Sequence, residues 1–253
     1  MPPLSHIKII CILLLGSAVS TQADDWPQLL GPNANNVSKE TGLIDSFPKT
    51  GPKQIFAKRI GTGYAAPSIK DGKVVVFHRA NKLYKIEEGD TFESVVKYLN
   101  NELSALKAND RLTVESIKLS LKNTNRRLPR GYIPLPETVA NHLDVEVIDC
   151  LDAKTGKLLW RHAYPTSYED PYGYNNGPRC APLLTKERVY TYGAEGVLLC
   201  LDFASGKQIW RRDTHKDFTV IPNFFGVGST PILQGDLLLT MVGGQPNSGM
   251  VAF

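Results

Sequence analysis

The chain contains two copies of one pattern, and this repeat constrains the fold more than any other feature of the sequence. The first copy begins at Cys150 and ends at Arg161, and the second begins at Cys200 and ends at Arg211, an offset of 50 residues. Each copy reads Cys-Leu-Asp, then a short segment containing Gly-Lys, then residues ending in Trp-Arg. An aspartate accepts backbone hydrogen bonds at the start of a tight turn, and a glycine supplies its positive φ. The pattern therefore predicts one strand–turn–strand unit, used twice.

A strand-based repeat of about 40–50 residues is typical of a β-propeller, in which four-stranded blades surround a central channel. Three proline-containing openings, Ala66-Pro, Ala181-Pro and Thr230-Pro, each precede a hairpin and a β-rich strand. We therefore expect an all-β fold, a partial propeller of four-stranded blades. About three blades fit the chain, with a small inserted α/β module.

The N-terminus has the pattern of a secretory signal peptide. Lys8 precedes an apolar run over residues 9–15, and the small residues Thr21 and Ala23 precede the expected cleavage, which follows Ala23. The alternative is a membrane anchor, but the run is too short to span a bilayer. We expect residues 1–23 to be removed, the mature chain to have no transmembrane span, and the protein to be exported, periplasmic or extracellular.

Three further segments follow this leader. Residues 24–80 are expected to hold an arm, a ring-closing strand and the first half of blade 1. Residues 81–144 are an insertion, and residues 145–253 form the rest of blade 1, blade 2 and part of blade 3. The ring-closing strand is placed at residues 53–59 because Phe56 occupies the position of Trp210 in a matching Lys-Gln-Ile context. The third repeat stops before its turn, so we expect a C-terminally truncated part of a longer reading frame.

The insertion differs in character from the repeats. Four apolar residues, Phe92, Val95, Val96 and Leu99, recur on one face of an expected helix, and Leu103 and Leu106 extend that face. Asp90 is expected to cap this helix with Glu93 three residues on, and Thr113 to cap a second helix. With short strands on both sides, the order is strand–helix–helix–strand.

The repeat resembles the pyrroloquinoline-quinone (PQQ)-type propeller repeat, also called the tryptophan-docking repeat, Asp-x-x-x-Gly-x-x-x-Trp. The residues at the motif positions are Asp152, Gly156 and Trp160 in the first repeat and Asp202, Gly206 and Trp210 in the second. The opening Asp25-Trp-Pro-Gln, together with the segments over residues 214–217 and 223–229, looks like secreted propeller proteins of planctomycete type. The resemblance covers residues 24–80 and 145–253 and implies a fold shared by BamB-type outer-membrane assembly scaffolds and quinoprotein alcohol dehydrogenases.

The resemblance leaves the function open. The dehydrogenases use an adjacent pair of cysteines beside the quinone, and this sequence has none; their calcium ligands and catalytic aspartate cannot be matched either. We therefore expect an exported, non-catalytic scaffold that binds a cell-envelope protein or glycan, without a cofactor. The alternatives are a fragment of a PQQ-dependent alcohol dehydrogenase, which would need PQQ and calcium, and a purely structural scaffold.

The insertion resembles a LysM module, because Tyr84-x-Ile-x-x-Gly-Asp-Thr91 opens its strand–helix–helix–strand order. Such modules bind N-acetylglucosamine polymers, including peptidoglycan. The resemblance implies a glycan groove at Gly89, Asp90 and Thr91. The alternative is a decoration that only packs on the ring.

Two long loops between blades, over residues 164–181 and 213–230, are the candidate ligand face, because loops on a rigid scaffold commonly carry function. Their aromatic, amide and mixed-charge residues suit a carbohydrate or a peptide, although the loops could instead cap the ring and bury their aromatics. The candidates are Tyr168, Asp170, Tyr174, Asn175, Arg179, His215, Asp217, Asn223 and Phe224.

Several functions are not favoured by the sequence. The histidines lack metal-ligand spacing, and neither a nucleophile elbow nor a phosphate-binding loop is present. A formal net charge of +4 is too small to indicate a nucleic-acid partner. Cys150, Cys180 and Cys200 are interpreted as small buried strand residues, with a disulfide from Cys180 as the alternative. We therefore name no catalytic residue and no metal ligand.

Overall fold

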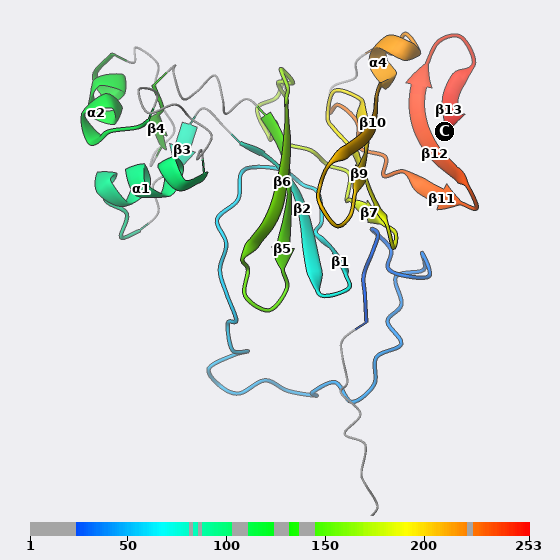
Figure 1. Ribbon diagram of the computed structural model, residues 1–253, viewed down its shortest axis with the longest axis horizontal. Helices are drawn as coiled ribbons and strands as arrows, with labels where there is room; N and C mark the ends of the chain where they lie inside the picture. The colour runs from blue at the N-terminus through cyan, green and yellow to red at the C-terminus, as the bar shows by residue number, and fades with distance from the viewer. Residues whose placement is uncertain are drawn as a thin grey trace, which may run out of the picture.

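The computed structural model describes residues 24–80, 83–85, 88–102, 111–123, 132–136, 145–221 and 225–253. Three antiparallel sheets stand side by side like the blades of a fan (Figure 1). Sheet 1 consists of β1 (Ser68–Lys70), β2 (Lys73–Ala80), β5 (Val145–Asp152) and β6 (Leu158–Pro165). Sheet 2 consists of β7 (Leu183–Leu184), β8 (Arg188–Tyr192), β9 (Val197–Asp202) and β10 (Gln208–Asp213). Sheet 3 consists of β11 (Ile232–Gln234), β12 (Leu237–Gly244) and β13 (Ser248–Ala252).

The sequence repeat corresponds to a repeat in strand register, which confirms the expected partial propeller. Cys150 pairs with Trp160 in sheet 1, and Cys200 pairs with Trp210 in sheet 2. Both tight turns have the expected chemistry. Asp152 accepts hydrogen bonds from the Lys154 and Thr155 amides at 3.1 and 2.8 Å, and Asp202 accepts one from the Ser205 amide at 2.8 Å. The four-stranded sheets are therefore two blades of one design.

The blades pack through a tryptophan that lies on a glycine of the next blade. A Cβ atom added to Gly206, whose φ is +71°, would lie 2.4 Å from the ring of Trp160. The indole Nε1 of Trp160 also donates a hydrogen bond of 3.1 Å to the carbonyl oxygen of Phe203. Only a glycine both adopts this backbone conformation and leaves room for the ring. The Asp-x-x-x-Gly turn is therefore the docking site for the preceding blade's Trp.

Phe56 takes the same position at blade 1. A Cβ atom on Gly156 would lie 2.6 Å from the Phe56 ring. Among the described residues, however, 51–60 are not part of a strand, which differs from the expected ring-closing strand. A strand needs a free sheet edge beside it, and the described sheets offer none at this position. The Phe56 side chain is therefore docked although its segment is not assigned to a strand.

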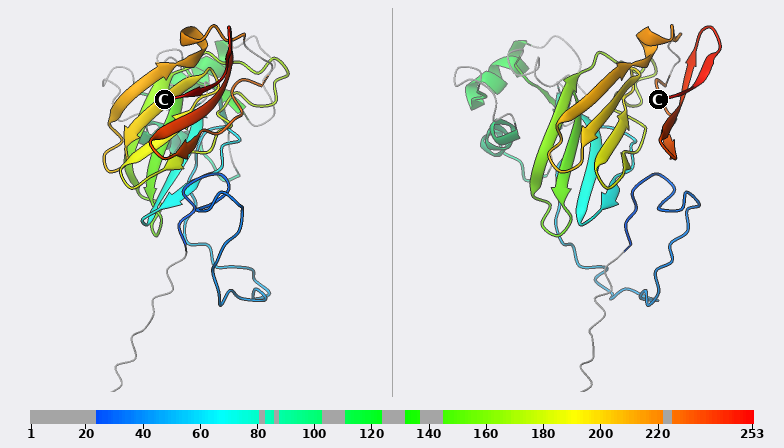
Figure 2. Two further views of the ribbon diagram at one scale, coloured as in Figure 1. Left: turned by 90° about the vertical axis from the view of Figure 1, so that its right-hand side faces the viewer. Right: turned by 45° about the vertical axis from the view of Figure 1, so that its right-hand side comes forward.

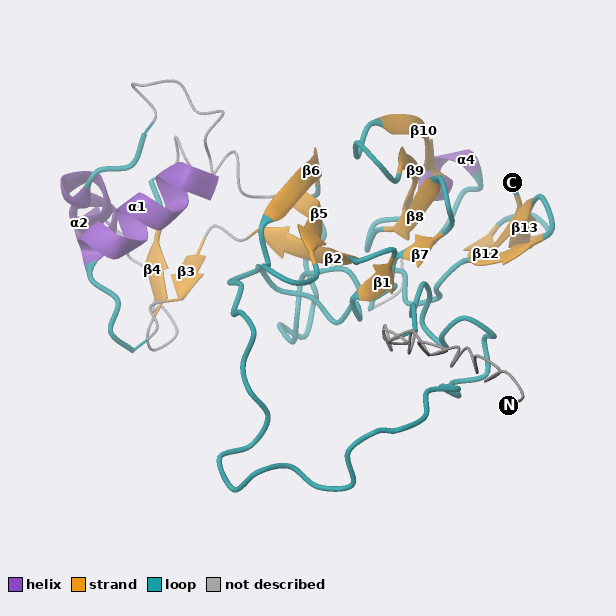
Figure 3. Cartoon of the chain, turned by 60° about the horizontal axis from the view of Figure 1, so that its bottom comes forward, coloured by secondary structure: helices purple, strands orange, loops and turns teal. Residues whose placement is uncertain are grey.

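The N-terminal arm joins the first two blades along the short strands β1 and β7. Trp26 and Ile69 exchange two backbone hydrogen bonds of 2.9 Å, and the Leu184 amide donates to the carbonyl oxygen of Pro27 at 2.8 Å. Beyond this point the chain makes a long excursion before returning to sheet 1 (Figure 3).

The insertion forms a separate layer beside sheet 1 (Figure 2). It contains β3 (Leu83–Lys85), α1 (Phe92–Glu102), α2 (Val114–Asn123) and β4 (Tyr132–Pro134), in the order expected from the sequence, and β3 pairs with β4. Its core is built by its own buried apolar residues, Val95, Leu99, Leu112, Ile117, Ile133 and Leu135.

The caps of the two helices agree only in part with the expectation. Thr91, and not Asp90, caps α1: the Ser94 amide donates to Thr91 Oγ1 at 3.1 Å, and the Thr91 amide donates to Ser94 Oγ at 3.0 Å. Thr113 caps α2 with Ser116 in the same way, as expected. Asp90 instead forms an ion pair of 3.0 Å with Arg59, because a helix one residue shorter leaves its carboxylate free to reach the arm. Leu103 and Leu106 lie outside the described residues.

The insertion enters and leaves sheet 1 at adjacent positions, because Ala80 and Val145 are cross-strand partners. Replacing residues 81–144 with a short glycine-containing turn should therefore leave the propeller sheets folded. The expected result is a two-state urea transition with an unchanged midpoint for the remaining sheets, followed by tryptophan fluorescence. Loss of the cooperative transition would show that the insertion is part of the propeller core.

All three described cysteines are buried and free, as the favoured interpretation held, so the alternative disulfide is wrong. Burial raises the pKa of the Cys150 thiol to about 11 and that of Cys180 to about 12. The proposed signal peptide over residues 1–23 lies outside the described residues. None of the helices in the described ranges is long and apolar enough to cross a membrane.

Candidate functional site: the loop face

The candidate site lies at the end of the sheets that carries two long loops, one from β6 to β7 and one from β10 to β11. We call this end the loop face. The opposite face carries the tight turns, and the Ala153 amide donates to the carbonyl oxygen of Gly72 at 2.9 Å, which joins two of these turns. The strand directions thus separate the turns from the long loops, as expected from the sequence. A short helix, α4 (Thr214–Asp217), begins the second loop.

The first loop is held in shape by a buried carboxylate. The Asp170 side chain, which is fully buried, accepts hydrogen bonds from the Tyr172 and Asn175 amides at 2.9 and 3.3 Å, and it pairs with Arg179 at 3.2 Å. The Arg179 guanidinium also lies 5.2 Å from the centre of the Tyr168 ring. Of the proposed ligand residues, Asp170, Asn175 and Arg179 therefore position the loop, because their polar groups are already paired within it.

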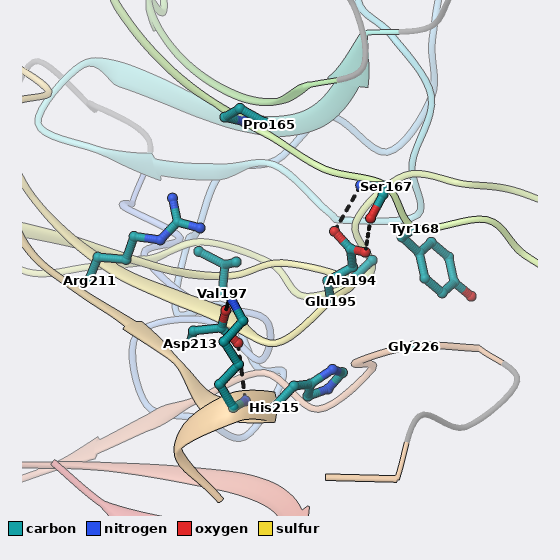
Figure 4. A pocket seen from close by; sticks show the side chains of 11 residues that line it. Pro165, Ser167, Tyr168, Ala194, Glu195, Val197, Arg211, Asp213, His215 and Gly226 are labelled. Atoms are coloured by element: carbon teal, nitrogen blue, oxygen red, sulfur yellow. Dashed lines mark hydrogen bonds and ion pairs between the residues drawn. The ribbon is translucent and has the colours of Figure 1, made fainter. Parts of the chain in front are cut away.

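A cavity of about 400 Å³ opens between the two loops and the β8–β9 turn (Figure 4). Tyr168 and His215 line it, as proposed. Lys216, from the second candidate loop, lines it as well, whereas sequence reasoning missed the other charged lining residues, Glu195, Arg211 and Asp213. Asp217 lies outside this lining, exposed and 3.9 Å from Arg212. Asn223 and Phe224 lie outside the described residues.

The cavity presents opposite charges on two sides. Glu195 accepts hydrogen bonds from Thr166 Oγ1 at 2.9 Å and from the Ser167 amide and hydroxyl at 2.9 and 2.7 Å. Burial alone would raise the pKa of Glu195, but these bonds outweigh it and lower the pKa, so the carboxylate is charged at neutral pH. Across the cavity, Arg211 lies over the Tyr164 ring with its guanidinium carbon 5.3 Å from the ring centre. Burial lowers the pKa of His215, which is therefore neutral at pH 7.

A second carboxylate, Glu146, lies behind the cavity and joins blade 1 to blade 2. It is 1% exposed, accepts a 2.5 Å hydrogen bond from the Tyr164 hydroxyl, and accepts one of 2.9 Å from the Ala194 amide. Burial raises the pKa of Glu146, and it raises that of Tyr164 well above the usual value. The sequence signal was a glutamate flanked by two valines at the start of strand β5.

Three exposed aromatic side chains form a patch on the same face. Tyr172 and Tyr174 come from the first loop and Phe225 from the second, and they are 58%, 70% and 52% exposed. The ring centre of Tyr172 is 6.1 Å from that of Tyr174 and 6.2 Å from that of Phe225. We call these three residues the aromatic patch. Tyr174 was proposed from the sequence as a ligand residue, and Tyr172 and Phe225 belong to the same two candidate loops.

The proposed glycan groove of the insertion consists of residues with local structural roles. Gly89 has a φ of +88°, Asp90 pairs with Arg59, and Thr91 caps α1. These roles do not test whether the segment binds a glycan.

Clustered metal ligands and an adjacent pair of cysteines are two features that the quinoprotein alternative would use. Within the described residues, no group of three or more His, Cys, Asp or Glu side chains is placed to hold a metal ion. The buried thiols are separated in sequence, so the adjacent-cysteine pair is absent as well.

Comparison with known proteins adds a family match over part of the chain. Residues 144–245 match the family model described as outer membrane protein assembly factor BamB. No curated protein sequence matches the chain.

Three similar solved structures are each matched over a minor part of their length. Quinohemoprotein alcohol dehydrogenase from Comamonas testosteroni is 20% identical with a TM-score of 0.29, over 38% of this chain and 15% of that one. BamB from Moraxella catarrhalis is 18% identical with a TM-score of 0.24, over 39% and 27%. The computationally designed Ika8 protein is 14% identical with a TM-score of 0.26, over 44% and 30%. The chain thus spans less than a third of each structure.

Proposed function

We propose that this PQQ-like repeat protein is an exported, non-catalytic propeller scaffold that binds an extended segment of a protein partner on its loop face. The observation that carries the proposal is the combination of the exposed aromatic patch with a cavity of mixed charge, both built on rigid blades. Exposed aromatic clusters on soluble proteins commonly mark interaction sites.

The two parts of the face suit two parts of a peptide. Tyrosine and phenylalanine rings provide apolar contact area at low cost in conformational entropy, and such residues are frequent binding hot spots. Beside them, the Glu195 carboxylate can accept hydrogen bonds from amide or cationic groups, and Arg211 can donate to carbonyl or carboxylate oxygens. An apolar side chain on the aromatic patch followed by a polar segment in the cavity fits this arrangement.

The family match supports an envelope location for the partner. Residues 144–245 match a model whose printed description is an outer-membrane assembly factor. The leader-like residues 1–23 support export to the same compartment. A partner protein in the periplasm or at the outer membrane follows as part of the proposal.

The test is a selection of peptides from a random display library on the immobilised chain. The affinity of the selected peptides should fall at least about tenfold in the double variant Tyr172→Ala/Tyr174→Ala, because truncating a hot-spot aromatic costs more than about 1 kcal/mol. Phe47→Ala is the matched control, since Phe47 is a 61% exposed aromatic elsewhere in the chain, and it should leave affinity unchanged.

Two other outcomes would contradict the proposal. Retention on insoluble peptidoglycan that depends on the aromatic patch, with no peptide enriched, would identify a glycan-binding face. Saturable micromolar binding of PQQ in the presence of calcium would favour the dehydrogenase alternative.

A further inference from the structure

The cavity on the loop face contains one carboxylate whose charge is not neutralised by the cations around it. Two carboxylates line the cavity, Glu195 and Asp213. Asp213 pairs with Lys216 at 3.2 Å, and as the N-cap of α4 it accepts a hydrogen bond of 3.3 Å from the Lys216 amide. The other cation of the lining, Arg211, lies over the Tyr164 ring. Both cations of the lining therefore have partners other than Glu195.

The hydrogen bonds of Glu195 leave one acceptor position open. A carboxylate offers about four such positions, two on each oxygen. Oε2 accepts from Thr166 Oγ1 and from the Ser167 amide, each at 2.9 Å, and Oε1 accepts from the Ser167 hydroxyl at 2.7 Å. One position therefore remains on Oε1. Because Glu195 lines the cavity, a donor inside the cavity can reach this position (Figure 4).

The carboxylate is prepared for a positive charge before any ligand arrives. Its three hydrogen bonds tie the β8–β9 turn to the start of the first loop, so binding does not have to order the Glu195 side chain. The same bonds lower the pKa of Glu195, which is charged at neutral pH. Burial keeps His215 neutral at pH 7, so this neighbour adds no competing positive charge.

A single open acceptor position discriminates between the two kinds of cationic side chain. A guanidinium group binds a carboxylate best through two parallel N–H···O bonds, one to each oxygen. Glu195 cannot accept in this way, because both positions on Oε2 are filled. A primary ammonium is a compact charge that needs only one acceptor on the carboxylate. The open position therefore fits an ammonium better than a guanidinium.

We propose that the cavity binds a primary ammonium group of the partner segment, from a lysine side chain or a free amino terminus, which donates a hydrogen bond to Glu195 Oε1. This inference rests on the proposed function, because it takes the loop face to be the binding site for an extended peptide. Recognition then has two points, an apolar side chain on the aromatic patch and an ammonium in the cavity.

The first test uses the peptides that the random display library yields on the immobilised chain. Replacing their lysine with norleucine, which keeps the aliphatic stem and removes the ammonium, should raise Kd at least about tenfold, the effect of losing a charge-assisted hydrogen bond. In peptides that bind through their amino terminus, acetylation should have the same effect. Replacing lysine with arginine should also weaken binding severalfold, because only one acceptor position is open.

Glu195→Gln tests the protein side of the same contact. The glutamine amide can still form hydrogen bonds with Thr166 and Ser167, but the charge is gone. The change from lysine to norleucine should therefore alter affinity by less than about twofold in this variant, as for two independent sites. Glu187→Gln is the matched control, since Glu187 is an exposed carboxylate 3.7 Å from Arg188 and outside the cavity lining, and the tenfold effect should persist in it.

The outcomes separate this inference from the proposed function. Peptides that depend on Tyr172 and Tyr174 but tolerate norleucine and acetylation would overturn the ammonium site and leave the peptide-binding face standing. Arginine bound as tightly as lysine would overturn it too, as would a tenfold norleucine effect that persists in Glu195→Gln. A selection in which no peptide depends on Tyr172 and Tyr174 would overturn the proposed function, and this inference with it.

Discussion

Trp160→Ala is expected to lower the free energy of unfolding by about 3–5 kcal/mol, the usual cost of truncating a large buried aromatic residue. Trp160 is 9% exposed and packs in the cluster shared by sheets 1 and 2. The substitution removes this apolar contact, opens a cavity over Gly206, and leaves the carbonyl oxygen of Phe203 without the indole hydrogen bond. Urea unfolding of the purified chain measures the loss.

Trp210→Ala is the matched comparison. The sequence treats the two tryptophans alike, but Trp210 is only half-buried, and its ring lies 6.1 Å from that of Tyr190 and 6.4 Å from that of Phe253. Its removal should therefore cost clearly less than that of Trp160. Equal losses for the two variants would show that docking on a glycine adds nothing to the stability of a blade contact.

A pair of glycines isolates the docking contact from backbone strain. Gly206 and Gly72 have φ values of +71° and +70°, but only at Gly206 does an added Cβ meet the Trp160 ring, whereas Gly72 has nothing within 4 Å. Both alanine variants bear the cost of a positive φ. Gly206→Ala should therefore lower the free energy of unfolding by about 1–3 kcal/mol more than Gly72→Ala does, which is the typical cost of overpacking.

Asp149→Ala is expected to cost about 3–5 kcal/mol at neutral pH, because it leaves buried partners without their carboxylate. Asp149 is 1% exposed and accepts hydrogen bonds from Arg161 at 2.6 and 2.8 Å and pairs with His78 Nε2 at 3.1 Å. His78 Nδ1 in turn accepts from the Gly61 amide at 3.1 Å, so the interaction extends from blade 1 to the arm.

The cost of Asp149→Ala should depend on pH in a defined window. Burial alone would raise the pKa of Asp149, but the hydrogen bonds from Arg161 and His78 lower it to about 2. A carboxylate with a lowered pKa stabilises the fold fully above its unfolded pKa of about 3.9 and loses that contribution as the pH falls towards the folded value. The difference in the free energy of unfolding between the parent chain and Asp149→Ala should therefore shrink as the pH falls from 4 to 2.

Glu187→Ala provides the control for this series. Glu187 is exposed and lies 3.7 Å from Arg188, so its removal should change stability by less than about 1 kcal/mol. A constant difference between the parent chain and Asp149→Ala down to pH 2 would contradict the role of the carboxylate charge.

The blades could be predicted from the sequence because each carries a local signal. Asp152, Gly156 and Trp160 lie within nine residues of one another, and their spacing alone specifies the turn and the strand that follows it. The cap of α1 was misplaced by one residue because Asp90 and Thr91 are both good N-cap residues, and the sequence does not show that Arg59 engages Asp90. Residues 53–59 were predicted as a strand from pattern alone, without a pairing edge in the described chain.

The candidate site was predicted only where loop composition was informative. Tyr168, Tyr174 and His215 were found because aromatic and polar residues in long loops attract attention. Glu195 and Arg211 belong to a tight turn and a strand, and only the packing of blade 1 against blade 2 brings them to one cavity. The pairing of Asp170 with Arg179 could not be predicted, since a sequence does not show that two charges in one loop contact each other.

The pairing of Ala80 with Val145 also fixes an order of events during folding. Sheet 1 requires β2 and β5 to meet across the whole of residues 81–144, whereas β8 and β9 of sheet 2 are joined by residues 193–196 alone. The entropy lost on closing a loop increases with its length, so sheet 2 can form early and sheet 1 only after a distant encounter. A module with its own core, folded before that encounter, brings its two ends together and shortens the effective loop. The inserted segment would then promote the pairing of β2 with β5 in the first blade.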